Sequence, residues 1–90
     1  MNMNDKRDAD SVWDLLEELV KENTKANEAI QTGYSDARES VIIQYAGISD
    51  KVLYQGKFEL DMGLLRVLPI QTCRQVLLDV FEMLREEKYR

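Results

Sequence analysis

Hydrophobic residues near the end of the chain recur with helical spacing. Ile70, Cys73, Leu77, Val80 and Leu84 follow one another at intervals of three and four residues, the pattern of an amphipathic helix with one apolar face. Pro69 precedes them, and the fixed φ of proline suits the first turn of a helix. The pattern predicts a helix over about 69–88, whose apolar face must be covered by another part of the chain or by another chain.

A second apolar stripe begins after a polar segment over residues 1–10, which we expect to be a flexible tail. Ser11 with Asp14 three residues later resembles a capping box, and Gly33 suits the left-handed end of a helix. The pattern predicts a helix over about 11–32. The positions that form a heptad-like seam along it are Val12, Leu16, Leu19, Asn23, Ala26 and Ile30.

The middle of the chain fits two structures. Asp36 and Glu39 resemble another capping box, and helical spacing continues to Val52. This favours a helix over about 35–55 followed by a short helix over about 60–67. The run at 41–46 lacks the alternation of a half-buried strand, so we predict a mainly α fold, a small helical bundle of three long helices and one short one.

The alternative is an α+β fold with a hairpin over about 51–68 between the helices. From Val52 to Leu60 the even positions are apolar or glycine and the odd ones mostly polar, which is the two-residue period of a strand. Asp61-Met62-Gly63 would then form the hairpin loop.

The totals indicate one folded domain over residues 11–90. The chain has 90 residues, 44% of them hydrophobic, with one proline and four glycines, an ordinary composition for a globular protein. No run of residues is long and apolar enough to span a membrane. The single cysteine fits a reducing compartment, so we expect a cytoplasmic protein.

Residue types exclude several classes of enzyme. The chain has no histidine and one cysteine, so it lacks Ser-His-Asp triads, Cys-His pairs and histidine-containing zinc sites. The glycines fit no phosphate-binding loop. Cys73 lies on the apolar stripe and is expected to be a small buried hydrophobe. We predict no enzymatic activity, no cofactor and no metal.

Charge is concentrated in one segment. The net charge is −5, and residues 8–28 contain seven acidic residues and two lysines, which accounts for the whole excess. A basic partner would be attracted to this segment, whereas nucleic acid and anionic membranes would not. The candidates for an acidic partner surface are Asp14, Glu17, Glu18 and Glu22.

The predicted function is therefore protein binding, by a homo-oligomeric adaptor or by an inhibitor of a basic, nucleic-acid-binding target. The apolar stripes of the first and last predicted helices would associate with a second copy. The candidates for that seam are Leu16, Leu19, Ala26, Leu77, Val80 and Leu84.

An alternative function comes from a short sequence motif. Residues 46–49, Ala-Gly-Ile-Ser, resemble the turn of helix-turn-helix repressors, in which glycine permits the tight turn and serine opens the recognition helix. This resemblance implies a DNA-binding transcriptional regulator. Its DNA contacts would be Ser49, Lys51, Tyr54 and Gln55.

Overall fold

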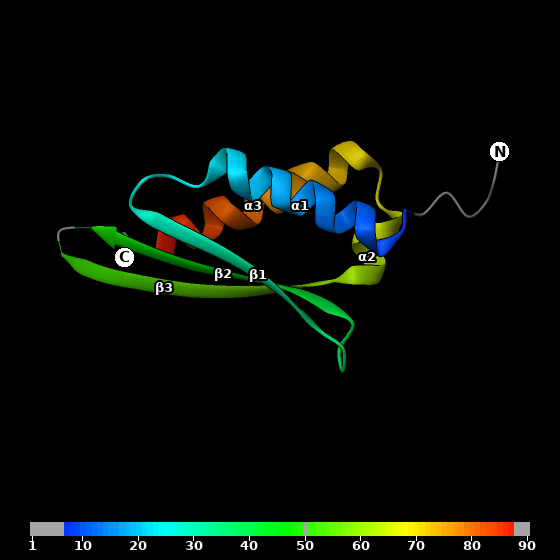
Figure 1. The fold of residues 1–90 in the computed structure, drawn as a ribbon, viewed down its shortest axis with the longest axis horizontal. Helices are drawn as coiled ribbons and strands as arrows, with labels where there is room; N and C mark the ends of the chain where they lie inside the picture. Colours follow the sequence, from blue (N-terminus) through cyan, green and yellow to red (C-terminus); the bar gives the residue numbers. More distant parts are fainter. Residues whose placement is uncertain (1–6, 50, 88–90) are drawn as a thin grey trace.

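The computed structural model describes residues 7–49 and 51–87. A three-stranded sheet lies against helices that cover one of its faces (Figure 1). The elements in chain order are α1 (Ala9–Asn23), β1 (Glu28–Ser35), β2 (Ser40–Ser49), β3 (Val52–Asp61), α2 (Met62–Val67) and α3 (Ile70–Glu87). The protein is therefore an α+β fold, and the prediction of a mainly α bundle is wrong.

The strands form an antiparallel meander in the order β1-β2-β3. Tyr45 in the central strand lies opposite Ile30 on one side and Gly56 on the other. Glu39 and Lys51, in the two connections between strands, have φ values of 48° and 66°. Because β2 pairs with both other strands, β1 and β3 are the two edges of the sheet that the described residues form.

The core lies between the sheet and the helices. Val41, Ile43 and Tyr45 alternate along β2 and point to the helix side, where all three are buried. The helices contribute apolar residues at helical spacing, and Phe81 of α3 is among the largest fully buried side chains. The other buried helix residues are Val12, Leu15, Leu16, Leu19, Met62, Leu65, Cys73, Leu77, Val80 and Leu84.

The first helix is shorter than predicted. α1 ends at Asn23, whose side-chain amide donates to the carbonyl of Leu19 at 2.7 Å. The Thr24 hydroxyl donates to the carbonyl of Val20 at 2.6 Å, and Thr24 itself has extended backbone angles. These local bonds satisfy the last carbonyls of the helix, so the seam stops there. Gly33, predicted to cap the helix, lies inside β1.

The predicted helix over 35–55 is replaced by strands. It covers β2 and the start of β3, while Asp36 and Glu39 lie in the turn between β1 and β2. The side of β2 that faces away from the helices also carries apolar side chains, Ile42, Ala46 and Ile48. Apolar residues on both faces hid the two-residue period that marks a strand.

The last two helices occur close to their predicted positions. α2 and α3 correspond to the helices predicted over 60–67 and 69–88, and residue 88 lies outside the described residues. The alternation from Val52 to Leu60 belongs to β3, which pairs with β2. The alternative hairpin over 51–68 needs a returning strand after its loop, but residues 64–67 are helical. Of the predicted tail, residues 9 and 10 begin α1, and residues 1–6 are not described.

Candidate functional site

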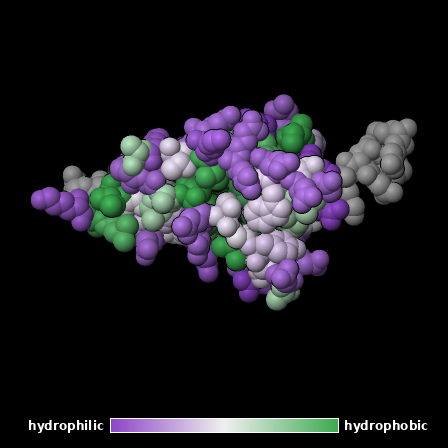
Figure 2. All heavy atoms as spheres, viewed as in Figure 1, coloured by the Kyte–Doolittle hydropathy of each residue, from purple (hydrophilic) through white to green (hydrophobic). Residues whose placement is uncertain are grey.

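The four acids predicted to form a partner surface lie on one exposed side of α1. Asp14, Glu17, Glu18 and Glu22 are all exposed, and Lys21 lies among them. The opposite side of the same helix buries Leu16 and its neighbours in the core, so the 3.6-residue period of the helix turns the acids to solvent. In Figure 2, hydrophilic residues cover much of the surface over α1.

These carboxylates take no part in the ion pairs between described residues. Those pairs are Arg38–Glu59, Arg85–Glu28 and Arg85–Glu82. The acidic side of α1 therefore presents negative charge that no cation of the described chain neutralises through an ion pair. Such a surface attracts a basic partner at a distance, and more weakly as salt screens the charge.

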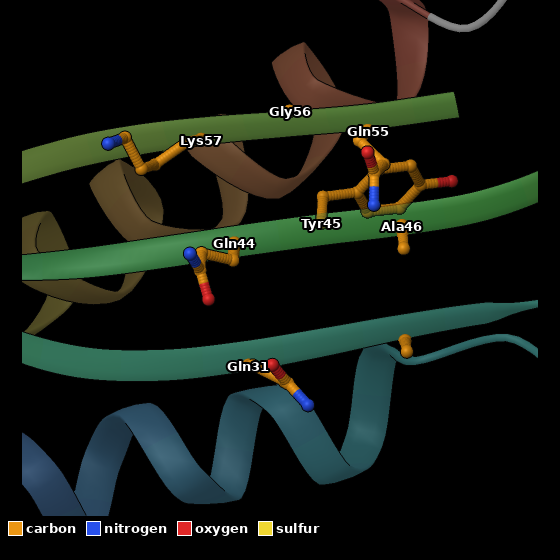
Figure 3. Close-up of a pocket in the computed structure, with 8 residues that line it drawn as sticks. Gln31, Gln44, Tyr45, Ala46, Gln55, Gly56 and Lys57 are labelled. Carbon is orange, nitrogen blue, oxygen red and sulfur yellow. The ribbon is translucent and has the colours of Figure 1, made fainter. Parts of the chain in front are cut away.

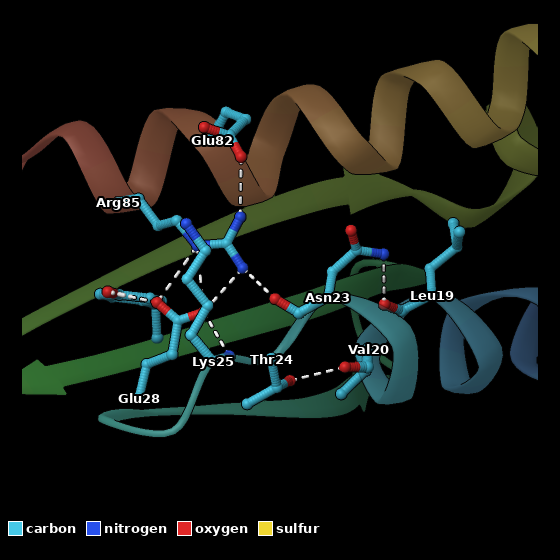
Figure 4. A network of polar contacts seen from close by, with 9 residues as sticks. Leu19, Val20, Asn23, Thr24, Lys25, Glu28, Glu82 and Arg85 are labelled. Atoms are coloured by element: carbon cyan, nitrogen blue, oxygen red, sulfur yellow. Dashed lines mark hydrogen bonds and ion pairs between the residues drawn. The ribbon is translucent and has the colours of Figure 1, made fainter.

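A second polar cluster is buried and joins four elements (Figure 4). Arg85 of α3 donates to Glu28 at the start of β1, with Nη2 and Oε1 2.6 Å apart. Arg85 also donates to the carbonyl of Asn23, the last residue of α1, and to Glu82 at 2.8 Å. The hydroxyl of Tyr45 in β2 donates to the other Glu28 oxygen at 2.8 Å.

The environment of Glu28 stabilises its ionised form. Its side chain has 0% exposure and that of Arg85 has 8%. Burial alone raises the pKa of Glu28, but hydrogen bonds from Arg85, the Lys25 backbone N–H and Tyr45 outweigh it and lower the pKa to about 2. The same hydrogen bond raises the pKa of Arg85. A carboxylate held in this way is suited to fixing the fold and is not placed to take up a proton from a substrate.

The sheet face that points away from the helices carries a shallow hollow of about 470 Å³ (Figure 3). Ala29 and Ala46 lie opposite each other on β1 and β2, and their small side chains leave the hollow open. Gln31 and Gln44 are the next pair of opposite residues on the same face. The remaining lining residues are Tyr45, Gln55, Gly56 and Lys57. Amides and one ammonium group can hydrogen-bond to a ligand, but this lining contains no carboxylate to act as a general base.

An apolar groove of about 240 Å³ lies between β3 and α3. Met83 of α3 is 38% exposed at this groove. The residues that line it are Phe58, Leu60, Val76, Asp79, Val80 and Met83. No signal in the sequence identified this groove, because its two walls are 16 or more positions apart and no local pattern relates them.

The predicted seam residues lie mostly inside the single chain. Ala26 is exposed in the connection between α1 and β1. The other five, buried at 0–6% exposure, are Leu16, Leu19, Leu77, Val80 and Leu84. These five cover one another and the sheet, so self-association cannot rest on them.

The helix-turn-helix prediction is wrong, because Ala46-Gly47-Ile48-Ser49 belongs to β2 and makes no turn between helices. Gly47 lies opposite Tyr54 in the ladder of β2 and β3. Of the predicted DNA contacts, Ser49 ends β2, Lys51 is in the connection to β3, and Tyr54 and Gln55 are in β3. These positions form no recognition helix.

Cys73 is buried as expected, with its thiol 3.7 Å from the Leu65 carbonyl. Burial raises the pKa of this thiol, which lowers the fraction of reactive thiolate. Among the described residues, no group of three or more Cys, Asp or Glu side chains is arranged to hold a metal ion. In that same part of the chain, no helix is long and apolar enough to cross a membrane.

Comparison with protein-family models, with curated proteins and with solved structures finds no match for this chain.

Proposed function

We propose that this chain is a non-catalytic protein-binding module that presents the acidic side of α1 to a basic surface of a partner protein. The observation that carries the proposal is the exposure of Asp14, Glu17, Glu18 and Glu22 on one side of one helix, outside the ion pairs of the described chain. The other side of α1 is fixed in the core, so these carboxylates are held on a rigid element before a partner arrives.

The chemistry of the surface specifies the class of target. A lysine- and arginine-rich protein surface complements it, and nucleic-acid-binding proteins carry such surfaces to contact phosphates. Occupying such a surface would make this chain an inhibitor that competes with nucleic acid. The lone cysteine is consistent with action in the cytoplasm.

A charge-reversal experiment tests the surface directly. The variant carries Asp14→Lys, Glu17→Lys and Glu18→Lys. The matched control carries Asp36→Lys, Glu39→Lys and Glu86→Lys, which change the net charge equally at exposed sites on other elements. Binding of a lysine- and arginine-rich peptide would be measured by fluorescence anisotropy at low salt and at 0.15 M salt, where the Debye length is about 8 Å.

The α1 variant is expected to lose most of the binding and its salt dependence, while the control keeps more of both. Equal loss in both variants would show that only the net charge matters, and unchanged binding in the α1 variant would remove the proposal. Capture from a lysate with the same three chains then identifies the target, as a basic protein retained by the wild type and the control alone. Circular dichroism confirms that each variant is folded.

A further inference from the structure

β3 is an edge strand with a free side. It pairs with β2 over all ten residues from Val52 to Asp61, and no described strand lies on its other side. In an antiparallel sheet, alternate residues of an edge strand turn their N–H and C=O groups outward. β3 can therefore accept another strand without giving up its pairing with β2.

The apolar groove runs beside this free edge. Phe58 and Leu60 of β3 are only half buried beneath α3, although both point to the helix side of the sheet. The other wall belongs to α3 and consists of Val76, Val80 and Met83, with Asp79, which accepts a hydrogen bond from Gln75, as its one charged member. A chain that pairs with β3 and carries its own apolar helix on the same side would cover these residues. A second copy of this chain meets both conditions, because its own β3 is an edge strand and its own α3 lies on the same side of the sheet.

The charges of β3 specify how two copies would pair. Lys57 and Glu59 lie on the face away from the helices, opposite Gln44 and Ile42 of β2. Antiparallel pairing of two β3 strands about Phe58 sets each Lys57 opposite the Glu59 of the other copy, and the twofold axis makes this contact twice. The Glu59 carboxylate already accepts hydrogen bonds from Arg38 and Ser40 of its own chain, so Lys57 of the second copy would join this cluster and not meet an unpaired acid. Pairing centred one residue earlier would set Lys57 against Lys57, which is unfavourable.

The twofold axis at Phe58 also brings the apolar grooves of the two copies together. A twofold rotation at Phe58 reverses the order of residues along α3, so the Met83 end of one groove meets the Val76 end of the other. Phe58 of one copy lies opposite Phe58 of the second, which favours aromatic contact. The charges of Lys57 and Glu59 and the apolar groove therefore both favour a twofold axis at Phe58.

We propose that two copies of this chain associate through antiparallel pairing of β3 about Phe58, forming a continuous six-stranded sheet in which Met83 of each copy packs in the groove of the other. This interface uses different residues from the acidic side of α1, so it stands or falls independently of the proposed function. A closed isologous dimer also removes two exposed strand edges.

The first experiment uses two complementary charge reversals, Lys57→Glu and Glu59→Lys, with molar mass measured by size-exclusion chromatography and light scattering. Each variant alone places like charges opposite each other twice and should dimerise about tenfold more weakly than the wild type. An equimolar mixture restores both opposite-charge contacts in a heterodimer and should recover association. Lys21→Glu and Glu17→Lys on α1 are the charge-matched controls for Lys57→Glu and Glu59→Lys, respectively, and each should leave the dimer unchanged. Circular dichroism checks the fold, because Glu59 also pairs with Arg38.

The second experiment tests the pairing register. Chains carrying Lys57→Cys are mixed with chains carrying Glu59→Cys under mild oxidation, and only the mixture should form a disulfide-linked heterodimer at these sites. The native Cys73 is buried in both chains. Cross-linking of Lys57→Cys chains to one another would place the axis elsewhere and overturn the register.

The groove is tested with Met83→Lys, which puts an ammonium group into it at an exposed position. This variant should remain folded and shift toward monomer. A wild-type chain that stays monomeric at 100 μM (roughly the range in which a weak dimer forms) would overturn the proposal and leave the β3 edge for a strand of another protein. A dimer that neither charge reversal nor Met83→Lys weakens would overturn it as well.

Discussion

Arg85 and Glu28 stand 57 positions apart in the sequence and form an ion pair with 2.6 Å between nitrogen and oxygen. Through Arg85, the last helix is tied to the end of α1 at Asn23 and to Tyr45 of the central strand by way of Glu28. One buried contact thus fixes how both long helices meet the sheet. A buried carboxylate and guanidinium are costly to separate, because either one alone would be left unpaired in the core.

The pH dependence of stability follows from the pKa of Glu28, which burial raises but hydrogen bonds from Arg85, Lys25 and Tyr45 lower from 4.5 in the unfolded chain to about 2 in the fold. Its contribution is fully present above pH 4.5 and is lost as the pH falls from 4.5 to 2. The loss should be on the order of 3 kcal/mol of unfolding free energy.

Urea unfolding at pH values between 2 and 7 measures this contribution. Other carboxylates with lowered pKa values, such as Asp8 and Glu59, act in the same direction. The difference between the wild type and Glu28→Gln therefore isolates Glu28. Parallel curves for the two proteins would show that Glu28 does not titrate as described.

A double-mutant cycle tests the coupling of the pair. Glu28→Gln or Arg85→Met alone leaves a buried polar partner unsatisfied and should lower the unfolding free energy by about 3–5 kcal/mol. The double variant should lose less than the sum of the two, with a coupling of about 0.5–3 kcal/mol. The same cycle at the exposed pair Arg38–Glu59 is the control and should show much weaker coupling. Additive losses at Glu28 and Arg85 would contradict the contact.

Two glycines in the sheet should respond oppositely to alanine. A Cβ at Gly47 would lie 2.5 Å from the hydroxyl oxygen of Tyr45, which is held by Glu28. Gly47→Ala should therefore cost about 1–3 kcal/mol. A Cβ at Gly33 meets nothing within 4 Å, and its φ is not positive. Gly33→Ala should be neutral or stabilising by about 0.4–1 kcal/mol. Thermal unfolding compares them, and equal effects would argue against the crowding at Tyr45.

The start of α2 depends on a side-chain cap. The Asp61 carboxylate accepts a hydrogen bond from the Leu64 backbone N–H at 2.9 Å. Asp61→Ala should cost about 1 kcal/mol, whereas Asp61→Asn, which keeps an acceptor oxygen, should cost little. Chemical denaturation distinguishes the two. If alanine and asparagine were equally damaging, the charge of Asp61 and not its capping bond would matter.

Prediction from the sequence succeeded where one element contains its own signal. The apolar spacing from Ile70 to Leu84 identified α3, because a helix is built from contacts between residues three and four apart. It failed over 28–49, where strands form through partners in other segments. Ile42 on the open face removed the alternation expected of a half-buried strand over 41–46. The short-range bonds of Asn23 and Thr24 that end α1 gave no pattern that distinguishes a cap from a polar position of the seam.

The candidate sites divide in the same way. Exposure of Glu17 and Glu18 follows from the period of their own helix and was predictable. The groove beside Phe58 and the pairing of Glu28 with Arg85 join residues from distant segments, so no local pattern indicated them.

The sequence by itself determined the local properties of this protein: an amphipathic last helix, an acidic and exposed side on the first, and a set of residue types without histidine. Tertiary structure alone decided that residues 28–35, 40–49 and 52–61 form a sheet, that the apolar stripes are buried inside one chain, and that a groove lies beside an edge strand. The physical reason is that strand pairing and burial depend on contacts between distant segments, whereas helical periodicity and charge are properties of neighbouring residues.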